Sequence, residues 1–319
     1  MTYLSAIGEI LVEIMADRPG LGFTEALALT GPFPSGAPAI FAAQAALMGQ
    51  PTALIGTIGD DDFGRMTLDR LAGLGVETKA IARHPDRPTG TAFVRYRPDG
   101  NRDFVFNIRH SAAGQLRLGP AARAVLARTR HLHIMGSSLA SPAVTRVILQ
   151  AVALAKAQGA SLSFDPNLRP ELLRRPGMAE AMRQILGLCD IFLPSGGELT
   201  LLTEAKDEGA AITELLGRGP KVVVHKRGDQ GASWLAAGQA LHQPAFPVTE
   251  VDPTGAGDCF GAALLAAWLQ GRPPEQALRL AAAAGALAVT QRGPMEGAAG
   301  LAQVQALASR PPQKGLRSG

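Results

Sequence analysis

Short apolar runs alternate with stretches of helical periodicity along most of the 319 residues, and this alternation constrains the fold more than any other feature. Continuous apolar runs are typical of strands that are buried on both faces of a parallel sheet. The predicted strands are Tyr3–Ile7, Thr52–Ile55, His131–Ile134, Ser161–Phe164, Ile191–Leu193 and Val222–His225. The predicted helices are Ile40–Met48, Gly64–Leu74, Pro142–Ala157, Met178–Leu186 and Ala210–Leu216. The pattern predicts a three-layer α/β/α domain with a mostly parallel sheet.

Two segments interrupt this alternation. Thr89–Ile108 alternates apolar and polar residues around a Pro98–Asn101 turn, which is typical of a hairpin. Glu13–Pro34 is irregular and contains several Gly and Pro residues. We interpret residues 13–34 and 89–110 as a small antiparallel β-sheet lid on a single domain that spans residues 1–319; an ordinary surface hairpin is the alternative. Residues 310–319 are expected to form a flexible tail.

The composition excludes several classes of protein. Hydrophobic residues make up 46% and charged residues 18%, the reverse of what disorder requires. The net charge of +4 comes without a run of five basic residues, and aromatic residues are only 5%, so we expect no nucleic-acid partner. Cys189 and Cys259 are far apart, which fits a reducing cytoplasm. No signal peptide or spanning segment is visible, so we expect a soluble cytoplasmic protein with no membrane partner.

The segment Val251–Leu269 carries the chemistry. Gly255–Ala256–Gly257 opens an apolar helix, where converging backbone N–H groups and the helix dipole favour an anion. The segment therefore predicts a phosphate site. Asp258 follows in the first helical turn and has two interpretations. It is either a helix cap or a general base between an acceptor hydroxyl and the transferred phosphoryl group.

The run DPTGAGDCFGAALL, which begins at Asp252, resembles the carboxy-terminal signature of the ribokinase-like carbohydrate kinase family. Similar elements cover nearly the whole chain. The resemblance implies transfer of the γ-phosphoryl group of ATP to a sugar hydroxyl. In this family the aspartate at the position of Asp258 removes the hydroxyl proton, and the backbone of Gly255, Ala256 and Gly257 forms an anion hole. The spacing of other phosphate-binding motifs is absent.

Two amino-terminal elements resemble the family's sugar site. The segment GEILVE ends at Glu13, where the family carries an acid that binds sugar hydroxyls; a solvated charge at a strand end is the alternative. Ser35–Ala42 resembles the family's glycine motif, which implies that Gly36 and Ala37 approach the sugar. Ile40 stands where the family usually carries Asn, so the sugar contacts are expected to differ there.

Further along, Arg109 and the segment DPNLRP resemble elements of the fructokinase and 2-keto-3-deoxygluconate kinase branch. The resemblance implies that Arg109, Asp165, Asn167 and Arg169 bind substrate. DPNLRP follows a predicted strand, and ligands of open α/β sheets lie beyond the carboxyl ends of strands. The alternative for Asp165 is an ion pair with Arg169 within a self-capped loop.

The nucleotide side is expected in KRGDQG, where Lys226, Gly228 and Gly231 would contact ATP; a plain hairpin turn is the alternative for Asp229–Gly231. The segment 281–290 resembles the helix that lines the adenine pocket. Acids at 60–62 are interpreted as caps of the following helix.

Metal sites are implied by resemblance alone. Glu198 belongs to an N-x-x-E element that organises Mg²⁺ through water, with Ser195 in place of the asparagine. Asp252 lies where related enzymes hold K⁺. No histidine spacing suits zinc, and His131 and His133 are expected to be hydrogen-bonded core residues.

The substrate that these elements favour is a ketohexose of the tagatose or fructose type. Two arginines near the sugar suit an acidic sugar, so 2-keto-3-deoxygluconate is the alternative. A nucleoside kinase is the next alternative, and the last is a non-catalytic sugar or nucleotide sensor on the same fold. The expected cofactors are ATP, Mg²⁺ and K⁺. Pairing of lid edges into a homodimer is a further expectation.

Overall fold

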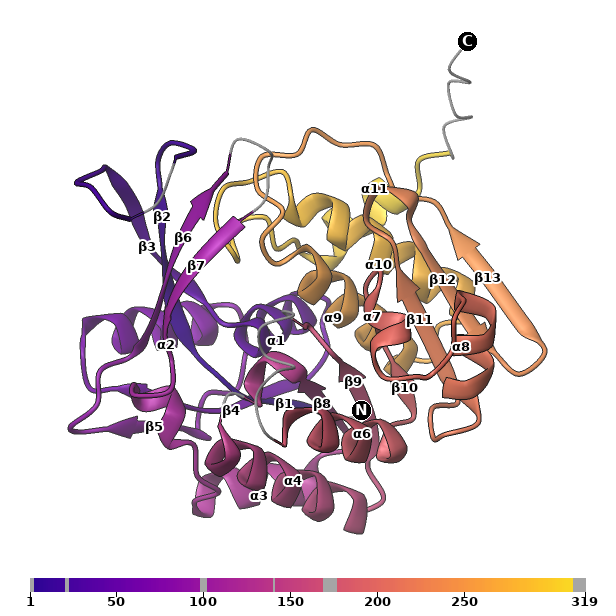
Figure 1. The fold of residues 1–319 in the computed structure, drawn as a ribbon, viewed down its shortest axis with the longest axis horizontal. Coiled ribbons are helices and arrows are strands. Elements are labelled where there is room, and N and C mark those ends of the chain that lie inside the picture. The colour runs from indigo at the N-terminus through magenta and orange to yellow at the C-terminus, as the bar shows by residue number, and fades with distance from the viewer. Residues whose placement is uncertain (1–2, 21–22, 98–101, 140, 169–176, 312–319) are drawn as a thin grey trace.

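The computed structural model describes residues 3–20, 23–97, 102–139, 141–168 and 177–311. Within these ranges the strands form a large sheet and a small sheet (Figure 1). The strands of the large sheet are β1 Leu4–Ile7, β4 Thr52–Gly59, β5 Ile81–His84, β8 His131–Met135, β9 Ser161–Asp165, β10 Ile191–Phe192, β11 Val222–Lys226, β12 Ala232–Ala236 and β13 Gln239–Gln243. All six predicted strands are therefore confirmed.

The large sheet has the order β13-β12-β11-β10-β9-β8-β1-β4-β5. The strands from β5 to β11 pair in parallel, and β12 and β13 extend the β11 edge in antiparallel fashion. Because parallel strands end at one edge, the residues that follow β1, β9, β10 and β11 meet there even though they are far apart in the chain. We therefore expect a ligand-binding site at this edge of the large sheet.

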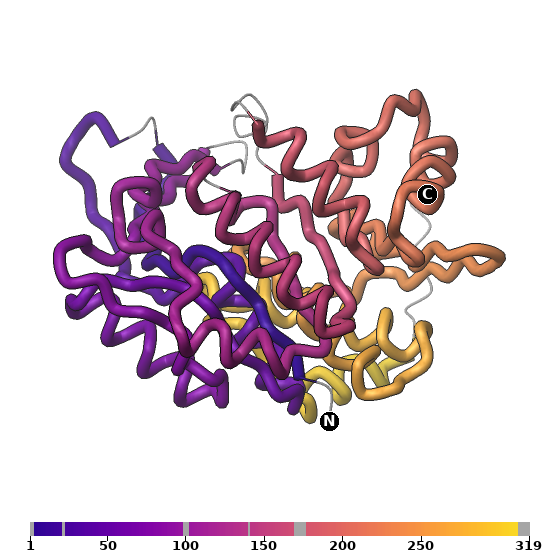
Figure 2. Tube along the Cα trace, turned by 90° about the horizontal axis from the view of Figure 1, so that it is seen from below, coloured from indigo at the N-terminus to yellow at the C-terminus, as the bar shows by residue number. Residues whose placement is uncertain are grey.

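Helices cover both faces of the large sheet. Their bounds are α1 Ala37–Leu47, α2 Asp62–Gly73, α3 Pro120–Arg128, α4 Pro142–Ala157, α6 Met178–Leu188, α7 Glu198–Leu201, α8 Glu208–Leu216, α9 Ala256–Leu269, α10 Pro274–Ala288 and α11 Leu301–Ala308. One core layer contains α1, α9, α10 and α11, and the other contains α3, α4, α6 and α8. Figure 2, seen from below, brings α3 and α4 to the front. The three-layer prediction is confirmed. None of the described helices has the length and apolar character to cross a bilayer.

Helix α9 is buried on all sides because it packs against α1, α10 and the large sheet. Its residues from Asp258 to Ala267 are all buried, and many of them are Ala or Gly. Small side chains let the three helices approach one another closely. A helix enclosed in this way has a well-defined starting point, which in α9 lies at the edge where β9 and β11 end.

The small sheet consists of β2 Leu11–Ala16, β3 Leu29–Ser35, β6 Gly90–Tyr96 and β7 Arg102–Asn107, in the order β3-β2-β6-β7. These strands fall in or beside the segments for which the lid is predicted, and the turn at 98–101 lies outside the described residues. The expectation of an antiparallel sheet is wrong for its centre, where β2 and β6 pair in parallel. β2 follows β1 and β6 follows β5, so both leave the same edge of the large sheet and run in the same direction.

Asp61 connects the two sheets and caps α2. Its carboxylate accepts hydrogen bonds from Gly64 N at 2.8 Å and from the N and Oγ1 of Thr89, both at 2.7 Å. Thr89 immediately precedes β6. The predicted capping role is therefore confirmed for Asp61, which also fixes the point where the chain enters the small sheet.

A buried polar chain runs through the centre of the large sheet. His131 Nδ1 lies 2.7 Å from Ser161 Oγ, and its Nε2 lies 2.8 Å from Ser163 Oγ. Ser163 Oγ also lies 2.7 Å from His133 Nδ1. Burial lowers the pKa of His131 to about 4 and holds the pKa of His133 well below its usual range. Both imidazoles are therefore neutral core groups, as predicted.

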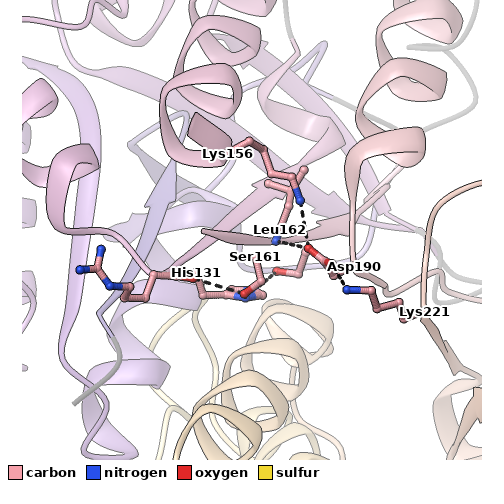
Figure 3. Close-up of polar contacts among 8 residues, drawn as sticks. His131, Lys156, Ser161, Leu162, Asp190 and Lys221 are labelled. Carbon is pink, nitrogen blue, oxygen red and sulfur yellow. Dashed lines mark hydrogen bonds and ion pairs between the residues drawn. The ribbon is translucent and has the colours of Figure 1, made fainter. Parts of the chain in front are cut away.

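Asp190 lies near this network, at the amino-terminal edge of the sheet (Figure 3). Its carboxylate accepts from Leu162 N at 2.9 Å, from Lys221 Nζ at 2.9 Å and from Lys156 Nζ at 3.3 Å. These contacts join β9, α4 and the start of β11. This edge therefore carries structural ion pairs, and it lies opposite the edge where the strands end.

The buried histidines predict a specific acid dependence of stability. The pKa of His131 is lower in the folded state, so its stabilising contribution is complete above its unfolded pKa and declines as the pH falls toward the folded value. Between pH 8 and pH 5 this loss amounts to about 2 kcal/mol in the free energy of unfolding. Urea unfolding of wild type and His131→Gln at both pH values should show a smaller decline in the variant. Equal declines would contradict the assignment.

Candidate active site

Two cavities meet at the carboxyl edge of the large sheet. The first has a volume of about 380 Å³ and lies between this edge, β7 and the start of α9. The second has a volume of about 920 Å³ and lies between the β11–β12 turn and α10. Ser195, Lys226, Pro253 and Gly257 line both cavities. The two spaces are therefore adjacent at the amino-terminal end of α9.

Helix α9 begins at a glycine whose backbone conformation and close neighbours leave no room for a side chain. Gly255 is the N-cap and has a φ of 81°, in the left-handed region. A Cβ on Gly255 would lie 2.4 Å from the carbonyl oxygen of Pro294, whereas one on Gly257 would meet nothing closer than Lys226 Nζ at 3.6 Å. No side chain caps this end, so the alternative in which Asp258 is the cap is wrong. Ala256 N donates to Pro253 O at 3.4 Å, whereas the N–H groups of Gly257 and Asp258 make no such bond within the described residues and remain available to an anion.

Asp258 is a buried carboxyl group at the wall of the first cavity. Its side chain is 7% exposed, and Asn167 Nδ2 donates a hydrogen bond to its Oδ1 at 3.0 Å. Burial, with a further contribution from Asp165, raises the pKa of Asp258 well above its usual range, although the charge of Lys226 opposes this. The group is thus a stronger proton acceptor than an exposed aspartate.

The DPN turn places both of its polar side chains toward the site. Asn167 has a φ of 41°, and its backbone N–H donates to Asp165 Oδ1 at 3.1 Å. Asp165 forms a buried ion pair with Lys226, and the alternative of an Asp165–Arg169 pair stays open. Arg169 itself lies outside the described residues.

Lys226 is a buried cation at the junction of the two cavities. Burial alone would lower its pKa, but the nearby carboxylates of Asp165 and Glu198 raise it overall, so the ammonium group stays charged. It was expected on the nucleotide loop, and it also lines the first cavity. Its position at the end of β11 directs it toward the start of α9, near Gly257.

Glu198 lies at the start of α7 and lines the first cavity. Its two oxygens accept from Leu168 N at 2.5 Å and Ser195 N at 2.7 Å. Burial and the charge of Asp165 raise the pKa of Glu198 to about 7. Ser195 thus contributes a backbone N–H at the position where the family carries Asn. Among the described residues, no three His, Cys, Asp or Glu side chains form a ready metal cluster.

Asp252 lies behind the site and is 1% exposed. Its carboxylate accepts from the Tyr96 hydroxyl at 2.6 Å, from Thr254 N at 2.9 Å and from Gly293 N at 2.9 Å. Burial would raise its pKa, but these hydrogen bonds lower it, so the group is ionised. Asp252 holds the turn that leads into Gly255.

Two carboxylates line the opposite end of the first cavity. Glu13 is only 7% exposed and accepts from Ser35 Oγ at 2.6 Å, so the alternative of a solvated charge is wrong. Glu9 accepts from Ser137 Oγ at 2.8 Å and from Ser138 Oγ. Sequence reasoning assigned Glu9 no role, although its place directly after the first strand was a usable signal.

Gly36 and Ala37 line the same cavity as these carboxylates, and their approach to a sugar stays a prediction. Gly36 has a φ of 107°, and a Cβ there would lie 2.5 Å from the carbonyl oxygen of Glu9. Ile40 lines the same cavity and presents an alkyl group where the family carries an amide.

Alternate residues of the small sheet form the remaining wall. Arg102, Phe104, Phe106 and Ile108 line the cavity together with the predicted Arg109. Spacing of two places the first four on one side of an extended segment, a signal that was present in the sequence. Arg102 Nη1 donates to Thr254 Oγ1 at 2.8 Å.

The second cavity is lined by the KRGDQG turn. Gly228 and Gly231 have φ values of 56° and 88°, and a Cβ on Gly231 would lie 2.1 Å from Gln243 O. The turn connects the antiparallel strands β11 and β12, so the hairpin alternative for Asp229–Gly231 is correct. The same turn also lines the second cavity. Gly285 and Ala286 of α10 lie on the facing wall, within the segment 281–290.

The two glycines at the start of α9 should respond differently to the same substitution. Gly255→Ala forces a left-handed Ala against a backbone carbonyl, so the free energy of unfolding should fall by about 1 to 3 kcal/mol. Gly257→Ala is the matched control, because its Cβ has room and Ala favours helix. Urea unfolding measures both, and equal destabilisation of the two variants would contradict this geometry.

Comparisons with known proteins identify the family of the chain. Residues 1–299 match the family model of the pfkB family carbohydrate kinases. Fructokinase-1 of Oryza sativa subsp. japonica is 33% identical over 299 residues, which are 90% of this chain and 92% of that one. The 2-dehydro-3-deoxygluconokinase of Thermoproteus tenax is 33% identical over 304 residues, with 93% and 91% covered.

Among solved structures, a putative Ribokinase II from E. coli in complex with ATP and Mg²⁺ matches with a TM-score of 0.92 and 45% identity, covering 96% of this chain and 99% of that chain. The family match over residues 1–299 and the relatives at 33% identity, which cover at least 90% of this chain, lead to one conclusion. The chain belongs to the pfkB family of carbohydrate kinases.

Proposed function

We propose that this carbohydrate kinase phosphorylates a hydroxyl of a ketohexose of the fructose or tagatose type, with Asp258 as the general base. The observation that carries the proposal is the position of Asp258. It is buried on the wall of the smaller cavity, one residue from Gly257, where the smaller cavity meets the larger one. A sugar and a nucleotide in the two cavities would meet at this residue.

In this proposal the sugar occupies the first cavity with the reacting hydroxyl beside Asp258. The hydroxyl oxygen forms a bond to the γ-phosphorus as the bond from that phosphorus to the β,γ-bridging oxygen breaks, and ADP leaves. Asp258 takes the hydroxyl proton. The hydrogen bond from Asn167 keeps the Asp258 carboxyl in place.

Positive groups at the junction of the cavities stabilise the transferred group. The first-turn N–H groups of α9, at Gly255–Gly257, face the junction, and the charged Lys226 lies next to Gly257. The ion pair with Asp165 keeps Lys226 oriented and protonated. Migrating negative charge therefore meets fixed donors rather than water.

ATP occupies the second cavity, where Gly228 and Gly231 allow close backbone approach and the small residues of α10 leave room for the base. Mg²⁺ would lie at the edge of the first cavity that Glu198 lines. Both Glu198 oxygens already accept backbone N–H groups, so Glu198 would hold Mg²⁺ through water. When bound, the ion neutralises phosphate charge. Activation by K⁺ near Asp252 stays a prediction.

The charge of the sugar end favours a neutral acceptor. Glu9 and Glu13 are both buried there, and carboxylates accept strongly from hydroxyls but repel an acidic sugar. Arg102 is engaged by Thr254. Arg109 is the feature that favours 2-keto-3-deoxygluconate as the second candidate, and relatives named for each activity are about equally similar.

The small sheet acts as the lid in this proposal. Its residues Phe104, Phe106 and Ile108 line the sugar cavity, so they would exclude water, which is a competing acceptor of the phosphoryl group. The homodimer through this sheet stays a prediction.

Replacing the base should remove turnover without unfolding the protein. Asp258→Asn keeps the shape of the side chain but cannot take a proton, so kcat should fall by roughly a hundredfold or more. Asp62→Asn, an exposed acid in the first turn of α2, is the control and should keep normal turnover. ADP release with saturating sugar measures both. Unchanged kcat in Asp258→Asn would eliminate the assigned role.

A panel of acceptors tests the substrate. ADP release with fructose, tagatose, 2-keto-3-deoxygluconate and a nucleoside should give the highest kcat/KM for a ketohexose. Glu9→Gln removes one repelling charge, so the ratio of ketohexose to acid turnover should fall, by roughly tenfold for one charge–charge contact of about 1.4 kcal/mol. A preference of the wild type for the acid would contradict the ketohexose assignment, and sugar binding without ADP release would favour a sensor.

A further inference from the structure

The small sheet is hydrogen-bonded to the turn that precedes α9. The Tyr96 hydroxyl donates to Asp252 Oδ1 at 2.6 Å, and Arg102 Nη1 donates to Thr254 Oγ1 at 2.8 Å. Tyr96 ends β6 and Arg102 begins β7, and the two residues are paired in the sheet. One end of the small sheet thus holds both residues that flank Pro253, directly before Gly255.

The loop after α10 joins β2, the strand next to β6 in the small sheet, to the same turn. Arg292 Nη2 donates to Ala16 O at 3.1 Å and pairs with Asp17 Oδ1 at 3.0 Å, at the end of β2. The next residue, Gly293, donates its N–H to Asp252 Oδ2 at 2.9 Å. Pro294 follows, and its carbonyl oxygen packs against Gly255. Both halves of the small sheet therefore converge on Asp252.

The geometry points to Tyr96 and Asp252 as positioning residues that couple the small sheet to the anion-binding turn of α9. In the described part of the chain, neither side chain lines either cavity, so neither touches a bound sugar or nucleotide. They act through Thr254 and Gly255, whose backbone they hold. This inference rests on the proposed function for its catalytic consequence, but the coupling itself is a property of the fold.

The coupling follows from the burial of Asp252, which is 1% exposed. A buried carboxylate needs several donors, and here one comes from β6, one from the turn and one from the loop after α10. When the small sheet is in place over the sugar, all three donors are present and the turn is held in one position. When the Tyr96 contact is lost, the turn keeps two backbone donors and becomes less restrained. Phosphoryl transfer would therefore be fastest when the sugar cavity is covered.

The chain supplies a matched pair for the test, since it has two tyrosines and each hydroxyl donates to a carboxylate. Tyr96→Phe removes the bond to Asp252, and Tyr3→Phe removes the bond to Glu77, which lies away from both cavities. We expect kcat of Tyr96→Phe to fall roughly tenfold, because small misplacement of catalytic groups is costly. KM for ATP should stay within about twofold, since the ATP contacts are intact. Tyr3→Phe should keep wild-type kcat within about twofold.

Hydrogen exchange gives a readout that does not depend on activity. The amides of Thr254 and Gly293 donate to Asp252, so they should exchange faster in Tyr96→Phe and at the wild-type rate in Tyr3→Phe. Wild-type exchange at both amides in Tyr96→Phe would overturn the coupling. An unchanged kcat with a raised KM for ATP in Tyr96→Phe would overturn it as well. If the wild-type protein phosphorylates no sugar, the proposed function fails, and the exchange comparison still decides the coupling.

Discussion

The structure depends on a charge balance at the carboxyl edge of the large sheet. Buried Asp165 and Asp258 and half-buried Glu198 surround one lysine, Lys226, which forms an ion pair with Asp165. Carboxylates crowded in this way cannot all be ionised without a cation, so burial raises the pKa of Glu198 and Asp258. A site with this balance holds a carboxyl group, Asp258, that accepts a proton more readily than an exposed aspartate. This property suits the general base of the proposed phosphoryl transfer.

The two ends of β9 and of β11 make different kinds of contact. β9 ends at Asp165 in the site, while near its start Leu162 N donates to Asp190 (Figure 3). β11 is framed in the same way, with Lys221 before it on Asp190 and Lys226 at its end on Asp165. The charged side chains at the amino-terminal edge thus join neighbouring strands. In β9 and β11 the structural ion pairs therefore lie at the amino-terminal end and the site residues at the carboxyl end.

Much of the fold was accessible from local patterns. Apolar runs and helical periodicity predicted six strands and five helices, because those patterns reflect burial on one or both faces of an element. The sequence also predicted where α9 begins, since a glycine pair directly before an apolar run is typical of a helix start. The parallel pairing of β2 with β6 was not predicted, because it depends on where two distant segments leave the large sheet.

The sequence by itself determined the strand and helix alternation, the glycine turn of α9 and the presence of an acid in its first turn. Only the tertiary structure decided that Asp165 pairs with Lys226, that Glu9 joins Glu13 in one cavity and that Tyr96 reaches Asp252. The physical reason is that periodicity reports the burial of a residue within its own element. Which distant side chains become neighbours depends on strand order and on the packing of the small sheet, and no local pattern encodes either.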